Sequence, residues 1–166
     1  SEENESNITL NLKNYGISNS TIQYLDKSSG MVLTLNNFNH SGSGNLSTAI
    51  SELKTETSSN VSFEMDHTKY LDHNSIKLDA LIGVDLNENK YSFLKNKAVI
   101  NQLTLVFDGF IKLNDNNQAL DINFNTPSSD FKNFLALVPE VYSKDISGVK
   151  TTGDFEVKGF LKGIVD

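Results

Sequence analysis

The sequence predicts a mainly β protein: a long, curved antiparallel sheet, either an open groove or a partly folded-over sheet, with one α-helix near residues 128–138. Two observations carry this prediction. Apolar and polar residues alternate over long runs, as expected of strands with one buried face. Turns rich in Asn, Asp and Gly separate the runs, and they are too short for the crossover that parallel strands require.

Composition excludes several functional classes. All fourteen basic residues among the 166 are lysines, and the net charge is −7. Without arginine forks and with a negative balance, nucleic acid is not an expected partner. The chain contains no cysteine, so disulfides and thiolate metal sites are absent. No apolar run approaches the roughly eighteen residues of a membrane-spanning helix.

The first third of the chain gives several shorter strand patterns. We expect residues 1–12 to form a polar N-terminal segment and a first strand, and residues 13–166 to form a single β domain that is a fragment of a larger protein. Gly16 interrupts the early pattern, and Asp26–Gly30 has turn composition. Leu46–Thr57 reads as one or two strands, although the apolar spacing within it also fits a short helix.

The longest alternation lies between residues 76 and 124. Even positions are apolar up to Leu86, and odd positions take over from Leu103 to Leu113, after predicted turns at residues 87–90 and 95–97. Asn114–Asn117 is a hairpin turn by composition, and a return strand follows. The residues expected to line one apolar face are Ile76, Leu78, Ala80, Ile82, Val84, Leu103, Leu105, Phe107, Ile111, Leu120, Ile122 and Phe124.

The helix is predicted over Ser128–Val138. Its apolar residues recur at i, i+3, i+4 and i+7, which places them on one helical face expected to cap the sheet: Phe131, Phe134, Leu135 and Val138. Ser128 or Ser129 can cap its start, and Pro139 should end or kink it. A strand follows, with Phe155 to Val165 alternating between faces.

One short helix cannot cover so much sheet. About ten strands would span roughly 48 Å, and ten-residue strands are roughly 33 Å long. A ten-residue helix is about 15 Å long. The sheet must therefore pack against itself as a sandwich or barrel, or curl into a gutter whose apolar interior is filled by something else. Periodicity gives these outcomes similar weight, and the long strands tilt the balance towards the gutter.

No motif identifies a reaction. His67 and His73, each preceded by an aspartate, are the only cluster that suggests a metal, and a solvated polar turn explains them better. The segment from Asp85 to Asn96 lacks the glycine and the glutamate of a calcium loop. We therefore expect no catalytic residues, no metal site and no cofactor, and a hydrolase of unrecognised type is a minor alternative.

Four segments together carry a family resemblance. They are Ile17–Met31, Leu35–Ser47, Tyr91–Leu113 and Asp130–Gly163, and with them nearly the whole chain from about Lys13 resembles the C-terminal region of AsmA-like proteins from Bacteroidetes-type bacteria. The resemblance rests on ordered segments and on the helix with its following proline. The family has no catalytic signature, so it supplies no catalytic residue to carry over.

The resemblance implies a large envelope protein on the periplasmic side of the inner membrane, anchored by an N-terminal helix outside this chain. AsmA-like proteins are similar to TamB-type and chorein-type proteins, whose curved sheets form apolar grooves that carry phospholipid. The expected function is thus a non-enzymatic contribution to phospholipid handling or outer-membrane biogenesis, with acyl chains and other envelope proteins as candidate partners. The alternative is a self-packed β-sandwich that serves in adhesion or protein docking.

Overall fold

The computed structural model describes residues 13–143, 148 and 150–165, and its main feature is one open sheet. The eight strands follow each other in the sheet in chain order, and every neighbouring pair is antiparallel. The strands are β1 (Asn14–Asp26), β2 (Met31–Gly44), β3 (Ile50–Met65), β4 (Thr68–Asp85), β5 (Lys90–Ile100), β6 (Leu103–Leu113), β7 (Gln118–Asp130) and β8 (Asp154–Val165). The predicted fold class is confirmed.

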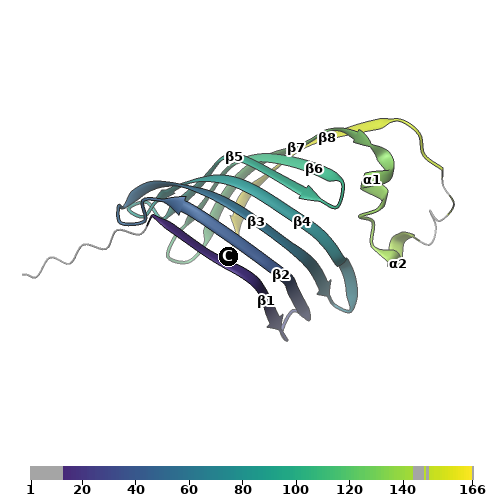
Figure 1. Ribbon diagram of the computed structural model, residues 1–166, viewed down its shortest axis with the longest axis horizontal. Helices are drawn as coiled ribbons and strands as arrows, with labels where there is room; N and C mark the ends of the chain where they lie inside the picture. The colour runs from purple at the N-terminus through teal and green to yellow at the C-terminus, as the bar shows by residue number, and fades with distance from the viewer. Residues whose placement is uncertain (1–12, 144–147, 149, 166) are drawn as a thin grey trace, which may run out of the picture.

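The sheet is curled into a half-pipe. In Figure 1, β1 to β4 run across the front, the following strands continue over the top, and β8 lies behind them. No second sheet packs on the described strands, so the sandwich and closed-barrel alternatives are wrong for this part of the chain. Within the described ranges β1 and β8 each pair on one side only, so both edges of this eight-strand sheet are open.

Two predicted boundaries need correction. The turn expected at residues 95–97 is a β-bulge inside a continuous β5, and Gly16 lies within β1 instead of ending it. The described residues therefore form eight strands, fewer than the ten or so predicted. The strand predicted over residues 8–12 lies outside the described residues. The segment Leu46–Thr57, for which a helix was also open, turns and then enters β3.

The single helix predicted over Ser128–Val138 is instead two short helices, α1 (Phe131–Leu135) and α2 (Glu140–Ser143). Residues 128–130 remain in β7 because β8 continues to pair with them as far as Asp130. The Asp130 carboxylate then caps α1 by accepting a hydrogen bond from the Lys132 backbone N–H at 3.0 Å. Pro139 separates the two helices, as its missing N–H requires.

Three of the β-bulges that bend the strands are each closed by a polar side chain. At the bulge in β2, Ser59 Oγ donates to the Asn36 carbonyl at 2.9 Å. At the bulge in β7 the Val157 N–H donates to Thr126 Oγ1 at 2.8 Å. At the bulge in β5, Asn96 Oδ1 accepts from the Leu81 N–H at 3.1 Å. These side chains replace backbone ladder bonds that a bulge interrupts.

Candidate functional site: a concave apolar face

The twelve residues predicted to line an apolar surface all lie on one face of the sheet. Register places Ala80 beside Asn96, Asn96 beside Phe107, and Phe107 beside Phe124. Likewise Ile82 meets Phe93 on β5, and Ile111 meets Leu120 on β7. Side chains of directly opposed residues point to the same side of a sheet. The structure thus brings together Ile76 to Val84, Leu103 to Ile111, and Leu120 to Phe124, as predicted.

This surface, which we call the concave face, extends well beyond those twelve residues. The register continues it across the neighbouring strands through Leu33, Leu35, Leu53, Val61, Phe63, Tyr91, Phe93, Ala98 and Leu161. The sequence shows the alternation of these residues, but their common face follows only from the pairing register. Ile22 and Tyr24 of β1 pair with Leu35 and Leu33 and add the last strand, so all eight strands contribute to one apolar surface.

Burial identifies the inside of the half-pipe. The buried apolar residues of the described chain are Val61, Ala80, Val84 and Leu103, and all four lie on the concave face. No described side chain is fully enclosed. In a single-layer sheet, side chains on the inner face are more buried than those on the outer face, because curvature brings the inner side chains closer together. The concave face is thus compacted by its own curvature and is not roofed by a second layer.

Three of the four polar residues buried on this face are structural, and the fourth is Thr55. Ser59, Asn96 and Thr126 are at most 8% exposed, and each is bonded to the backbone at a bulge. Their polar groups therefore have partners already, and they do not offer a catalytic constellation. The concave face presents mainly hydrocarbon to whatever occupies it.

Aromatic rings shape the floor of the half-pipe. Phe93 and Phe107 meet edge to face with ring centroids 5.5 Å apart. The Phe124 ring lies over Gly159, where an added Cβ would come within 2.5 Å of the ring. A larger residue than glycine at that position would displace the ring from the surface.

The predicted helix-cap residues lie at one end of the half-pipe (Figure 1). The rings of Phe131 and Phe134 contact Phe155 of β8 at centroid distances of 5.5 and 5.2 Å. Leu135 and Val138 are half-buried. Because α1 contacts β7 while α2 reaches β4, this segment crosses from one wall to the other and caps the end, leaving the length of the concave face uncovered.

The concave face is most exposed at its two edges. On β1, Ile17, Ile22 and Tyr24 are 45%, 38% and 55% exposed, and on β8 Leu161 and Val165 are 58% and 52% exposed. Large apolar side chains with this exposure, continuous with an apolar surface, mark a site of contact with another molecule. They extend the candidate site from rim to rim.

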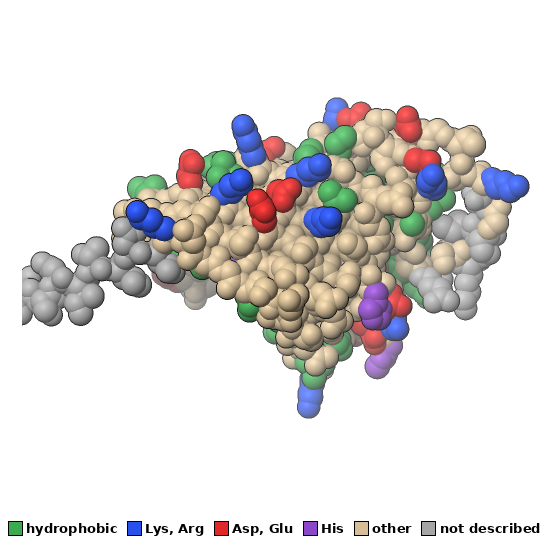
Figure 2. All heavy atoms as spheres, viewed as in Figure 1, with side chains coloured by type: hydrophobic (Ala, Val, Ile, Leu, Met, Phe, Trp, Pro, Cys, Tyr) green, Lys and Arg blue, Asp and Glu red, His purple; other side chains and the backbone are tan. Residues whose placement is uncertain are grey.

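The opposite, convex face carries charged side chains, together with exposed apolar residues such as Phe160 and Ile164 of β8. Figure 2 shows lysine and acidic side chains spread over the outer side of the sheet, with few apolar ones between them. Lys162 Nζ of β8 pairs with Asp121 Oδ2 of β7, and Lys112 Nζ of β6 pairs with Glu88 Oε2 of the β4–β5 turn, both at 2.7 Å. The sheet therefore has two chemically different sides.

The candidate metal residues do not converge. Asp66 and His67 both have left-handed φ angles, 49° and 62°, and form the turn between β3 and β4. His73 Nδ1 lies 2.8 Å from Asp72 Oδ1 at an exposed position. Within the described residues, no group of three or more His, Asp or Glu side chains could hold a metal ion.

Shifted acids have local explanations. Hydrogen bonds from Ser28 and Ser29 lower the pKa of Asp26 to about 2, and the capping bond from Lys132 lowers the pKa of Asp130. One carboxylate lies in the β1–β2 turn and the other at the end of β7, so they cannot act as a pair. Hydrogen bonding to the charged form is the dominant cause in both.

Of the helices in the described part of the chain, none has the length and apolar character needed to cross a bilayer. Comparison with protein-family models, with curated proteins and with solved structures finds no match.

Proposed function

We propose that the protein is a non-enzymatic lipid-handling module whose concave face holds the acyl chains of phospholipid. The observation that carries the proposal is an eight-strand apolar surface that no second layer covers among the described residues. Exposed apolar surface of this extent is unfavourable in water by about 25 cal/mol per Å². An occupant made of hydrocarbon removes that penalty.

The dimensions and the chemistry of the face suit acyl chains. Eight strands spaced about 4.8 Å apart span roughly 38 Å along the curve. Acyl chains need continuous apolar contact and no directional hydrogen bonds, and three of the four buried polar residues here are already bonded to the backbone. The uncovered long side lets a two-chain lipid enter sideways and keep its headgroup in water.

The resemblance to AsmA-like proteins supports the biological setting of the proposal. It implies a periplasmic position beside the inner membrane, a membrane anchor elsewhere in the full-length protein, and a role in phospholipid transport or outer-membrane biogenesis. Among the residues that the structure describes, the concave face carries no pair of titratable groups with shifted pKa values, which favours a carrier over an enzyme.

Lipid bound to matched variants tests the proposal. Phe107 and Phe110 both lie on β6, but Phe107 is on the concave face and Phe110 on the convex face, where Lys90 Nζ lies 4.4 Å from its ring centroid. The full chain, purified from a bacterial host, is analysed by native mass spectrometry for bound phospholipid. We expect lipid on the wild type and on Phe110→Asp, and at least tenfold less on Phe107→Asp.

Folding must be checked in the same samples. Circular dichroism and the urea midpoint report whether Phe107→Asp keeps the sheet. Photo-cross-linking from a benzophenone residue at position 82 or at position 92 gives a second measurement, because Ile82 faces inward on β4 and Ser92 faces outward on β5. Lipid adducts from both positions, or from neither, would contradict the proposal.

A second candidate function is docking of another protein, and the exposed apolar rims on β1 and β8 favour it. The occupant of the concave face would then be an apolar surface of an envelope partner. The two functions differ in one measurement. Docking predicts no phospholipid in an organic extract of the purified protein, whereas lipid handling predicts about one or more molecules per chain.

A further inference from the structure

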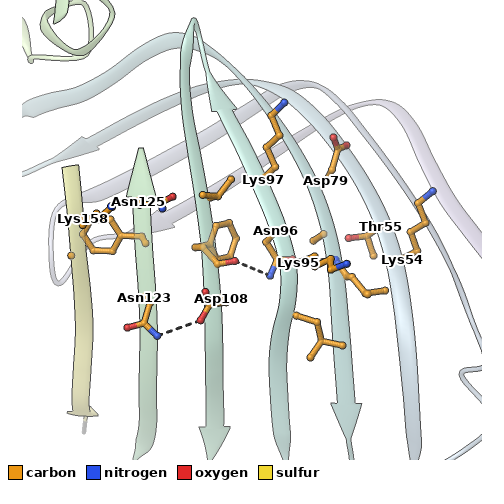
Figure 3. Close-up of a pocket in the computed structure, with 17 residues that line it drawn as sticks. Lys54, Thr55, Asp79, Lys95, Asn96, Lys97, Asp108, Asn123, Asn125 and Lys158 are labelled. Carbon is orange, nitrogen blue, oxygen red and sulfur yellow. Dashed lines mark hydrogen bonds between the residues drawn. The ribbon is translucent and has the colours of Figure 1, made fainter. Parts of the chain in front are cut away.

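The convex face carries a hollow that the proposed function does not use. Its volume is about 790 Å³, within the range of small-molecule sites. Figure 3 shows it from the convex side: Lys158 lies at one side, Lys54 at the other, and Lys95 and Lys97 between them. Apolar residues of the neighbouring concave-face rows, such as Leu78 and Ile82, are not part of its lining. The other lining residues include one cross-strand row whose side chains belong to the concave face: Thr55, Ala80, Asn96, Phe107, Phe124 and Gly159.

Two lysines at the hollow lack an acidic partner. Four lysines line it, Lys54, Lys95, Lys97 and Lys158, with two aspartates, Asp79 and Asp108. Lys54 Nζ lies 3.9 Å from Glu56 Oε1, and Lys158 Nζ lies 3.1 Å from Glu156 Oε1, so these two lysines are already paired. Lys95 and Lys97 have no ion-pair partner among the residues that the structure describes. Two neighbouring ammonium groups without an acidic partner favour an anion.

The lining of the hollow also includes apolar side chains on the convex face. The bulge in β5 adds Leu94 between Phe93 and Lys95 and turns it to the convex face, where it is 43% exposed. Val106 and Leu81 lie on the same side of the sheet and line the hollow with it. The ligand must therefore combine an anionic group with an apolar body.

One unpaired polar atom belongs to the same lining. Asn125 Oδ1 is buried and has no hydrogen-bond partner within the described chain. A buried acceptor without a donor costs about 1–3 kcal/mol. Rotation of the carboxamide towards the hollow would let this oxygen accept from a hydroxyl group of a ligand.

We propose that this hollow is a second binding site, separate from the concave face, that takes an amphipathic phosphate or carboxylate anion. The lysines hold the anionic head, and Leu81, Leu94 and Val106 contact the apolar body. A phosphate ester of a soluble molecule and a lipid headgroup share this chemistry.

The test uses the full chain with 2-naphthyl phosphate as the soluble probe and vesicles containing phosphatidate as the lipid probe. Binding of the soluble probe is followed by two-dimensional NMR and by titration at low and high salt. We expect shifts of the Leu94 and Val106 amides, and weaker binding as salt rises. Retention of the wild type, but not of the lysine variant below, by phosphatidate vesicles would show that the headgroup is the source.

The lysine variant is Lys95→Gln with Lys97→Gln, and its control is Lys27→Gln with Lys150→Gln, which removes the same charge from exposed positions outside the hollow. Removing two charges beside a surface anion should weaken probe binding about tenfold. The control should stay within twofold of the wild type. Equal affinity for both double variants would overturn the proposal.

The apolar contact has its own test. Leu94→Ser should weaken 2-naphthyl phosphate about fivefold, whereas Leu86→Ser, an exposed leucine in the β4–β5 turn, should leave it unchanged. Inorganic phosphate lacks the apolar body and should bind both variants equally. Amide shifts confined to the concave face would show that the naphthyl group occupies the groove instead, and would reject the site.

Discussion

Replacing Asn96 should show how much a single bulge residue stabilises the sheet. Asn96 is 5% exposed, its Oδ1 accepts from the Leu81 N–H at 3.1 Å, and its Nδ2 donates to the Phe107 carbonyl at 3.4 Å. The first bond is the stronger because it is shorter. Asn96→Ala leaves the Leu81 N–H unpaired, which costs about 1–3 kcal/mol. We expect the free energy of unfolding to fall by about 2 kcal/mol.

Urea unfolding of three variants separates hydrogen bonding from volume. Asn96→Leu restores the lost volume with an apolar side chain suited to the concave face, but it cannot accept from Leu81. It should still lose more than about 1 kcal/mol. Asn123→Ala removes an exposed amide that donates to Asp108 at 3.3 Å, and it should change stability by less than about 0.5 kcal/mol. Wild-type stability in Asn96→Leu would refute the assignment of Asn96 to the ladder.

Three further outcomes follow from the geometry. Gly109→Ala should abolish folding or lower the unfolding free energy, measured in urea, by more than about 3 kcal/mol. The reason is that φ is +131° at Gly109 and an added Cβ would lie 2.0 Å from the Asp121 carbonyl oxygen. Gly163→Ala is the control and should be tolerated, because an added Cβ there has no atom within 4 Å. Because the folded-state pKa of Asp26 is lowered from 3.8 to about 2, its contribution to stability is present above pH 4 and is lost as the pH falls towards 2. The stability difference between wild type and Asp26→Asn should shrink over that window. Phe155→Ala should speed amide exchange in α1 before it affects the central strands.

The sequence predicts the two faces of the sheet well because side-chain alternation has a fixed period of two. Ile76 to Val84 and Leu103 to Ile111 keep their parity because their pairing with β3 and with β7 is uninterrupted, so their common face could be read without coordinates. Whether that face is covered could not be read this way. Whether the apolar face is covered depends on the curvature of the sheet. That curvature comes from bulges and strand twist, and over eight strands it is too small to close the sheet.

The bulges are where sequence reasoning fails. Apolar residues on β5 switch from odd positions, at Tyr91 and Phe93, to even ones, at Ala98 and Ile100. A turn and a bulge both produce such a switch, and residues 95–97 carry no glycine or proline to favour the turn. The parity change without a turn residue is the signal that could have identified the bulge, and with it the outward position of Leu94.

The helix prediction fails for a different reason. Local spacing in Phe131 to Val138 fits an amphipathic helix, and Ser128 or Ser129 is an acceptable cap. Pairing of β7 with β8 overrides that preference, because the ladder extends to Asp130 and shortens the helix from its start. Only knowledge of the partner strand, more than twenty residues later in the chain, decides this boundary.

Strand order that equals chain order has a consequence for how the sheet holds together. Each strand exchanges ladder bonds only with the strands before and after it, so stability is nearly a one-dimensional sum of hairpin terms. Damage at one pair is then felt mainly by its neighbours. Such an architecture can be lengthened or shortened by whole hairpins at either open edge without redesigning a shared interior.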